Sequence, residues 1–271
     1  MPPAVQCRKC LILITCAATL TSIVVVVGVF RTGTPSDDRL RTMIFEKSVA
    51  AVSTSQTVAD SDVTTFRGRQ IKSSDQLPNA SATLNSFRCI PTKIAGLAFP
   101  ICVYEAKEDV YVSNSFILGG YFERRFVDRF VRLLRRYPDI QFVDLGANIG
   151  TFTLPAARIT DVVAVEPYIK SMTRLFKSIQ MGGVEKNVSL VFNAISNQRS
   201  TSKLGFYPTN VGGTFLSAVG TTDCAGVSCT QTILLDDLLP LMRRRRAVMK
   251  VDVEAHNIEC SPTPPPASSS S

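Results

Sequence analysis

The chain has 271 residues, of which 45% are hydrophobic and 19% are charged. This composition excludes disordered, collagen-like and coiled-coil proteins and is typical of a globular domain. The formal net charge is +8, which raises the question of nucleic acid. The basic residues are dispersed, apart from residues 243–246 and one Arg-rich helix, so we do not expect nucleic acid as a partner.

An apolar run without a charge begins at Leu11 and ends at Phe30. As a helix it matches the hydrocarbon core of a bilayer, about 30 Å thick, and it is longer than the apolar part of a cleaved signal peptide. We therefore predict that residues 1–30 are a cytosolic tail and a transmembrane signal anchor. Asp37 and Asp38 beyond the span favour a single-pass protein with a lumenal or extracellular domain.

The remainder divides into three parts. Residues 31–86 are rich in Ser, Thr, Asp and Gln and are predicted to form a flexible stem. Residues 87–260 can form one core of ordinary size, and residues 261–271 are a Ser/Pro tail. The cysteines are too scattered for a disulfide scaffold, and Cys224 and Cys229 are either unrelated or joined locally. Their spacing predicts no metal site.

The first expected elements of the domain are a hairpin and a helix. Residues 99–104 and 110–113 are short apolar runs separated by polar residues, a pattern that predicts two paired strands. Residues 121–137 predict an amphipathic helix whose apolar stripe, including Phe122, Phe126 and Phe130, faces the core. Its arginines would then form a solvated basic face.

The rest of the domain alternates between strand and helix. Strands are predicted at residues 140–145, 162–165, 188–192 and 247–253, and helices at 151–158, 167–181 and 234–242. Continuous apolar strands separated by amphipathic helices are typical of a parallel sheet covered on both faces. The predicted fold class is α/β, with a doubly wound parallel sheet.

The turn after the first of these strands carries the clearest chemical signal. It reads DLGANIG at 144–150 and leads directly into a helix. Gly146 permits a sharp turn and Gly150 permits close helix packing, and Glu166 at the end of the next strand can accept hydrogen bonds from ribose hydroxyls. The third glycine of a dinucleotide fingerprint is absent, which favours a nucleoside without phosphates. An ordinary tight turn is the alternative interpretation.

Six blocks in order resemble the signatures of FkbM-type S-adenosylmethionine-dependent methyltransferases. They are VDLGANIGTF at 143–152, VAVEP at 163–167, NAIS at 193–196, NVGG at 210–213, LDDL at 235–238 and MKVDVE at 249–254. The resemblance implies a Rossmann-like class I methyltransferase fold and O-methylation of a small molecule or glycan hydroxyl, with S-adenosyl-L-methionine as cofactor.

The resemblance also implies roles for particular residues. The methionine part of the cofactor would be surrounded by Asp144, Gly146, Asn148 and Gly150. Glu166 would hold the ribose, and Asn193 and Ala194 would lie beside the adenine. Asp252 and Glu254 would face the transferring methyl group or the acceptor, where a carboxylate can deprotonate a hydroxyl.

The chain departs from the family pattern near its C-terminus. A glycine and a second acid of the last block are replaced by Ala255 and Asn257, and low-complexity sequence follows. We therefore expect a fold that is incomplete at the C-terminus. The expected function is a membrane-anchored methyltransferase; the alternatives are a catalytically inactive binding or interaction module and, less well supported, a nicotinamide oxidoreductase.

Overall fold

The computed structural model describes residues 87–220, 224, 228–244 and 246–253, together with four short strands nearer the N-terminus. Those strands are β1 (Gly28–Arg31), β2 (Phe45–Ser48), β3 (Thr65–Arg67) and β4 (Gln70–Lys72). Most of the expected membrane span and stem, and all of the expected Ser/Pro tail, lie outside the described residues. Within the described part of the chain, no helix has the length and apolar character needed to cross a bilayer.

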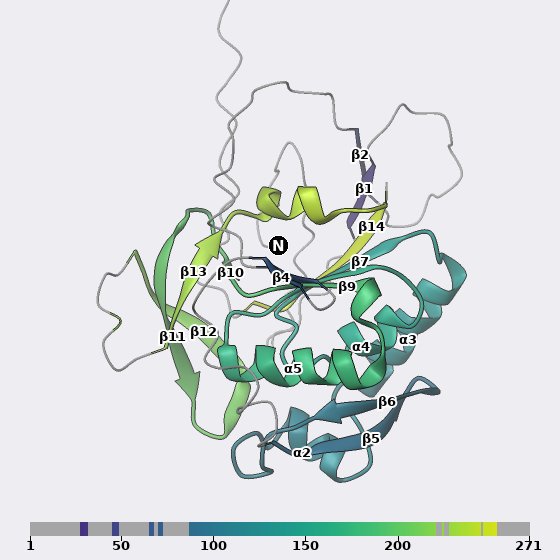
Figure 1. Ribbon diagram of the computed structural model, residues 1–271, viewed down its shortest axis with the longest axis vertical. Coiled ribbons are helices and arrows are strands. Elements are labelled where there is room, and N and C mark those ends of the chain that lie inside the picture. Colours follow the sequence, from purple (N-terminus) through teal and green to yellow (C-terminus); the bar gives the residue numbers. More distant parts are fainter. Residues whose placement is uncertain are drawn as a thin grey trace, which may run out of the picture.

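A six-stranded sheet forms the centre of the fold (Figure 1). Its order is β14-β7-β8-β9-β3-β4, and the four strands from β14 to β9 are parallel. The bounds of the parallel strands are Gln141–Leu145 for β7, Val162–Val165 for β8, Val188–Val191 for β9 and Ala247–Val251 for β14. Because β8 and β14 lie on opposite sides of β7, the strand order reverses at the end of β7.

Helices cover the two faces of the parallel strands. On one face lie α3 (Arg124–Arg136), α4 (Thr153–Ala157) and α5 (Ile169–Gly182), and on the other lies the 3₁₀ helix η2 (Leu235–Leu241) (Figure 1). Neighbouring strand residues alternate between the two cores, as Phe142 packs towards α3 and Val143 towards η2. The predicted α/β class and parallel sheet are confirmed.

A second sheet follows β9 and was not predicted from the sequence. It contains β10 (Ala194–Ile195), β13 (Cys229–Ile233), β11 (Ser200–Tyr207) and β12 (Asn210–Val219) in that spatial order. β11 pairs antiparallel with both β12 and β13, whereas β10 and β13 are parallel. The short 3₁₀ helix η1 (Glu185–Asn187) precedes β9.

Only one of the two strands of the predicted hairpin is found in the structure, so the prediction of the other strand is wrong. Residues 99–104 overlap β6 (Leu97–Cys102), but the partner is the preceding β5 (Cys89–Ile94), joined through Ala95 and Gly96, which both have positive φ. Residues 110–113 instead lead into α2 (Val112–Ile117). The carboxylate of Asp109 accepts hydrogen bonds from the N–H groups of Val112 and Ser113, which begins a helical turn there.

The Arg-rich helix is confirmed, but its buried face differs from the predicted stripe. Because α3 begins at Arg124, residues Val127, Phe130, Val131 and Leu134 face the core at helical spacing. Phe126 is 51% exposed. All six arginines of α3 lie at exposed positions.

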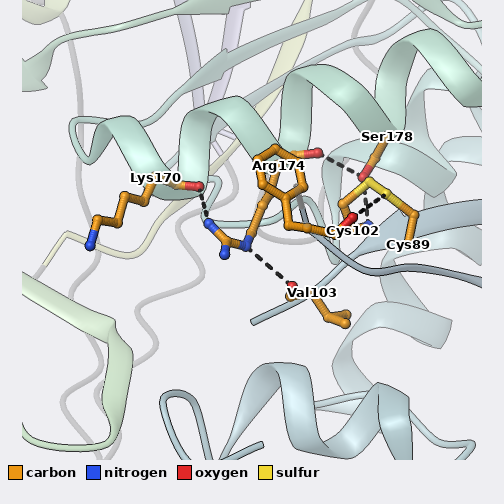
Figure 2. Close-up of a disulfide and its surroundings, with 7 residues drawn as sticks. Cys89, Cys102, Val103, Lys170, Arg174 and Ser178 are labelled. Atoms are coloured by element: carbon orange, nitrogen blue, oxygen red, sulfur yellow. Dashed lines mark hydrogen bonds between the residues drawn. A yellow bond between two sulfur atoms is a disulfide. The ribbon is translucent and has the colours of Figure 1, made fainter. Parts of the chain in front are cut away.

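Two disulfides connect neighbouring segments. Cys89 pairs with Cys102 across the ends of the β5–β6 hairpin, and Cys224 pairs with Cys229, which settles the latter as a local disulfide. Figure 2 shows how the first bridge lies against α5: the N–H of Cys102 donates to Ser178 Oγ over 2.9 Å, and Arg174 donates to the carbonyl of Val103. The hairpin is thereby attached to the helix that follows β8.

Candidate functional site

A pocket lies where the strand order reverses, at the carboxyl ends of β7, β8 and β14, which is the usual ligand position in open α/β sheets. It encloses about 1290 Å³, counting the open space at its mouth. Six of the residues expected at the site line it: Gly146, Asn148, Glu166, Asn193, Ala194 and Asp252. Asp144 and Gly150 lie behind this lining, and Glu254 falls outside the described residues.

The turn between β7 and α4 forms the floor of the pocket. Gly146 has a φ of 77°, and a Cβ there would overlap the carbonyl oxygen of Asp252. A Cβ at Gly150, whose φ is 102°, would lie 2.5 Å from Leu175 Cδ1. The sequence analysis expected Gly146 to permit the turn and Gly150 to permit close helix packing, and the contacts of Gly150 with Leu175 and Leu154 agree with the latter. The backbone of Asp252, the residue after β14, therefore makes the close approach at Gly146.

Glu166 joins the turn to the end of β8. Its two carboxylate oxygens accept hydrogen bonds from the backbone N–H groups of Asn148, over 2.7 Å, and Tyr168, over 2.8 Å. The residue is 5% exposed, and burial raises its pKa to about 7 while the two N–H donors act in the opposite direction. Each oxygen keeps a lone pair for a ligand hydroxyl.

Asp144, Lys250 and Asp252 form an ion cluster in which Asp144 and Lys250 are buried, while Lys250 and Asp252 line the pocket. Lys250 is 4% exposed, and its Nζ lies 3.3 Å from Asp144 Oδ1 and 3.2 Å from Asp252 Oδ2. It also donates to the carbonyl of Gly146 over 3.0 Å. Burial by itself would lower the pKa of Lys250, but the negative charges of Asp252 and Asp144 have the larger combined effect and raise this pKa. Asp144 is held further by Thr153, whose hydroxyl donates over 2.6 Å.

Burial raises the pKa of the Asp144 carboxyl above its ordinary value, and Lys250 limits this rise. Sequence reasoning did not identify Lys250 as a site residue. A signal was present, because Lys250 lies between two hydrophobic residues of a buried strand, where an unpaired lysine is rarely tolerated.

Glu123 is a second residue that sequence reasoning missed. It precedes α3, lines the pocket and adopts left-handed backbone angles, φ 57° and ψ 32°. This conformation costs a non-glycine residue about 1–2 kcal/mol. Burial, followed by repulsion from Asp252, raises its pKa to about 7 against the opposing effect of Lys250.

The opposite wall of the pocket comes from the second sheet and the end of β9. Asn193 is fully buried and donates from Nδ2 to the carbonyl of Gln231 over 3.2 Å, which fixes the segment leading into β10. The NVGG segment, residues 210–213, opens β12 and lines the pocket. A Cβ at Gly212 would lie 3.1 Å from Asn148 Nδ2, so this wall lies directly against the floor.

The ionisable side chains of the lining are mainly acidic. Glu123, Glu166 and Asp252 are the acids, Lys250 is the base, and the base is already paired with Asp252 and Asp144. Apolar side chains complete the lining, among them Val165, Ile195 and Leu204. Such a pocket favours a ligand that carries positive charge and an apolar ring, and it disfavours phosphate groups. Among the described residues, no three His, Cys, Asp or Glu side chains gather as metal ligands.

No family model matches the chain, and no curated protein matches it. Several solved structures resemble part of it, and three of them are named here. The complex of aTrm5 with tRNALeu is 17% identical over 42% of this chain and 33% of that chain, with a TM-score of 0.28. M. jannaschii tRNA m1G37 methyltransferase is 16% identical over 42% of this chain and 35% of that chain, with a TM-score of 0.27. T. thermophilus 16S rRNA N2 G1207 methyltransferase (RsmC), in complex with AdoMet and guanosine, is 24% identical over 43% of this chain and 32% of that chain, with a TM-score of 0.25. The chain spans about a third of the length of these proteins.

These comparisons contradict the expectation that nucleic acid is not a partner. Two of the three structures are named as RNA methyltransferases, and the third is a complex with tRNA. The physical ground for that expectation was also insufficient, because α3 concentrates six exposed arginines on one helix.

Proposed function

We propose that the chain is an S-adenosylmethionine-dependent methyltransferase. The observation that carries this proposal is the acid-lined pocket at the reversal of strand order, with Glu166 buried at the end of β8. A sulfonium nucleoside carries the positive charge that this lining favours. A nicotinamide dinucleotide would bring a pyrophosphate towards Glu123, Glu166 and Asp252, where like charges repel it.

The residues present fit this cofactor. Glu166 can accept hydrogen bonds from ribose hydroxyls, and Val165, Ile195 and Leu204 offer apolar surface for an adenine ring. Among the described residues, Glu123 Oε2 and Asn148 Oδ1 are buried oxygens without a hydrogen-bond donor. Both are acceptors, so a ligand bearing N–H groups would satisfy them. When bound, the cofactor supplies an activated methyl group.

Asp252 is the residue that we place at the acceptor. Its side chain is 29% exposed, it lines the pocket, and Lys250 holds one of its oxygens. The other oxygen can accept a hydrogen bond from an acceptor hydroxyl and orient it for in-line transfer. We include O-methylation of a small molecule or glycan in the proposal, and the corresponding role of Glu254 remains a prediction.

The proposal is tested by methyl transfer from labelled S-adenosylmethionine to sugars, glycans, small hydroxyl compounds and RNA. We expect transfer to one of these classes, and we expect Asp252→Asn to lower the rate by about 100-fold without abolishing cofactor binding. The expected control, Asp236→Asn at an exposed position of η2, retains full rate. Cofactor binding without transfer to any class would contradict catalysis and favour the binding-module alternative.

We further propose that the domain lies in an oxidising compartment, as a lumenal or extracellular domain on a membrane anchor. The Cys89–Cys102 and Cys224–Cys229 bridges support this, because disulfides persist mainly in such compartments. Protease protection of microsomes, scored with an antibody to the domain, tests it. Degradation of the domain without detergent would contradict the proposed orientation.

A further inference from the structure

We propose that Glu123 is the ligand of the positively charged ammonium group at the amino-acid end of the cofactor. This inference rests on the proposed function and assigns one end of the same pocket. Glu123 lies outside every sequence motif used to predict the site, and it reaches the pocket from the start of α3.

Glu123 occupies the N-cap position of α3, but its side chain does not cap the helix. The residue before a helix ordinarily caps it, with a side-chain oxygen accepting from a backbone N–H of the first turn. Glu123 makes no such bond, and its backbone is left-handed. Glu123 lines the pocket, and its carboxylate oxygen Oε2 is buried without a hydrogen-bond partner. A costly backbone conformation that turns a carboxylate into a cavity indicates a functional constraint at this position.

Glu123 also lacks a donor in its surroundings. Its Oε2 is buried and has no hydrogen-bond partner among the described residues. The nearby cation, Lys250, donates a hydrogen bond to Gly146 O and forms ion pairs with Asp144 Oδ1 and Asp252 Oδ2, and it makes no hydrogen bond to Glu123 Oε2. Glu123 Oε2 can therefore accept a hydrogen bond from a bound molecule.

The charges around Glu123 specify that this donor is cationic. Burial disfavours the ionised carboxylate, Asp252 repels it, and the attraction of Lys250 is too weak to offset both, so the pKa of Glu123 is raised to about 7. A bound ammonium group would favour the ionised form and remove this penalty. A neutral hydroxyl donor would leave most of the penalty in place.

Asn148 provides a second unpaired acceptor in the lining of the same pocket. Its Oδ1 is buried without a donor among the described residues, and its backbone N–H is bonded to Glu166. Because Glu166 is the proposed ribose ligand, Asn148 connects the ribose end of the pocket to the amine end. An ammonium group has three N–H donors and can satisfy both Glu123 and Asn148.

The binding of two nucleosides distinguishes the role of this subsite from that of the rest of the pocket. S-adenosylhomocysteine carries the amino-acid end with its ammonium group, whereas 5′-methylthioadenosine lacks that end and retains the adenosine. In calorimetric titrations, we expect Glu123→Gln to weaken S-adenosylhomocysteine at least tenfold, because a charge-assisted hydrogen bond is lost. The affinity for 5′-methylthioadenosine should stay within twofold, which also shows that the variant pocket is folded. Glu105→Gln, at an exposed position outside the pocket lining, should change neither affinity.

The pH dependence gives a second measurement. Lowering the pH from 7.5 to 6 reduces the ionised fraction of a carboxyl with a pKa of about 7 by about eightfold. Protonation of Glu166 affects both nucleosides, so it cancels in the ratio of their affinities. For the wild type, we expect the affinity for S-adenosylhomocysteine to fall relative to that for 5′-methylthioadenosine by up to about eightfold. For Glu123→Gln, we expect the ratio of the two affinities to stay constant over the same pH range.

The outcomes distinguish the subsite from the function. Equal weakening of both nucleosides, or no weakening of either, overturns the role of Glu123 while the proposed cofactor stands. Failure of the wild-type chain to bind either nucleoside overturns the proposed function, and the subsite with it.

Discussion

At the scale of single residues, the site depends on charges that neutralise one another away from water. Lys250 is buried between Asp144 and Asp252, so its removal leaves the fully buried Asp144 without a counter-charge. We predict that Lys250→Met lowers the free energy of unfolding by about 3–5 kcal/mol. Lys170→Met, at an exposed position of α5, should change it by less than about 0.5 kcal/mol. Urea unfolding of both variants measures the difference, and equal stability of the two contradicts the role of the cluster.

Glu166 gives a prediction about pH. Its pKa is about 7 in the folded chain and 4.5 when unperturbed, so between these values the folded state binds more protons than the unfolded state. Its contribution to stability is therefore complete below pH 4.5 and is lost as the pH rises through 7. The loss amounts to about 3 kcal/mol for a shift of this size.

Glu166→Gln removes this titration, whereas the raised pKa values of Glu123 and Asp144 remain in both proteins. The stability of the variant relative to wild type should therefore rise between pH 5 and pH 8. A relative stability that is constant over this range, measured by urea unfolding, is the result that this account does not allow.

The site could be predicted in part, and the division has a physical reason. The turn residues and Glu166 lie within 21 residues of Gly146 and follow from strand, turn and helix in succession. Glu123 and Lys250 reach the same pocket from α3 and β14, on either side of that unit in the chain. Nothing local marks Glu123, and the local sequence around Lys250 indicates only that a buried lysine needs a partner. The partners themselves are set by the order of strands in the sheet.

At the scale of elements, the same contrast appears. The strand expected at 162–165 matches β8, and the expected bounds of β7, β9 and α5 lie within two residues of those observed. These elements are buried on both faces or on one helical stripe, so their apolar periodicity is strong. The β5–β6 hairpin turns at Ala95 and Gly96, which is a weaker turn signal than Asn-Gly. β11 and β12 carry bulges that interrupt their alternation.

The hairpin provides a prediction at this scale. The Cys89–Cys102 bridge closes a loop with a sequence separation of 13, and cross-linking a loop of this length stabilises a protein by about 3 kcal/mol. We predict that the double variant Cys89→Ala/Cys102→Ala loses about 2–3 kcal/mol of unfolding free energy. A thiol reductant should lower the wild type to the same level. A variant as stable as the oxidised wild type would show that the hairpin is held by its packing on α5 alone.

At the scale of the whole molecule, the fold brings three separate parts of the chain to one pocket. The parallel strands provide the floor, α3 provides Glu123 and β12 closes the opposite side. The sequence analysis expected a fold that is incomplete at the C-terminus. Among the described strands, β14 is the last in the chain and lies at one edge of the main sheet. The charge pattern of the pocket arises from this assembly, and we expect it to favour a cationic nucleoside over a phosphate-bearing one.

Calorimetric titration of the purified chain with S-adenosylmethionine, beside NAD as the phosphate-bearing competitor, tests the central claim most directly. We predict saturable binding of S-adenosylmethionine at one site below millimolar concentration and no measurable binding of NAD. Glu166→Ala should abolish the binding, and Glu105→Gln should leave it unchanged. Absence of saturable binding at millimolar S-adenosylmethionine, or equal binding of NAD, would contradict the account.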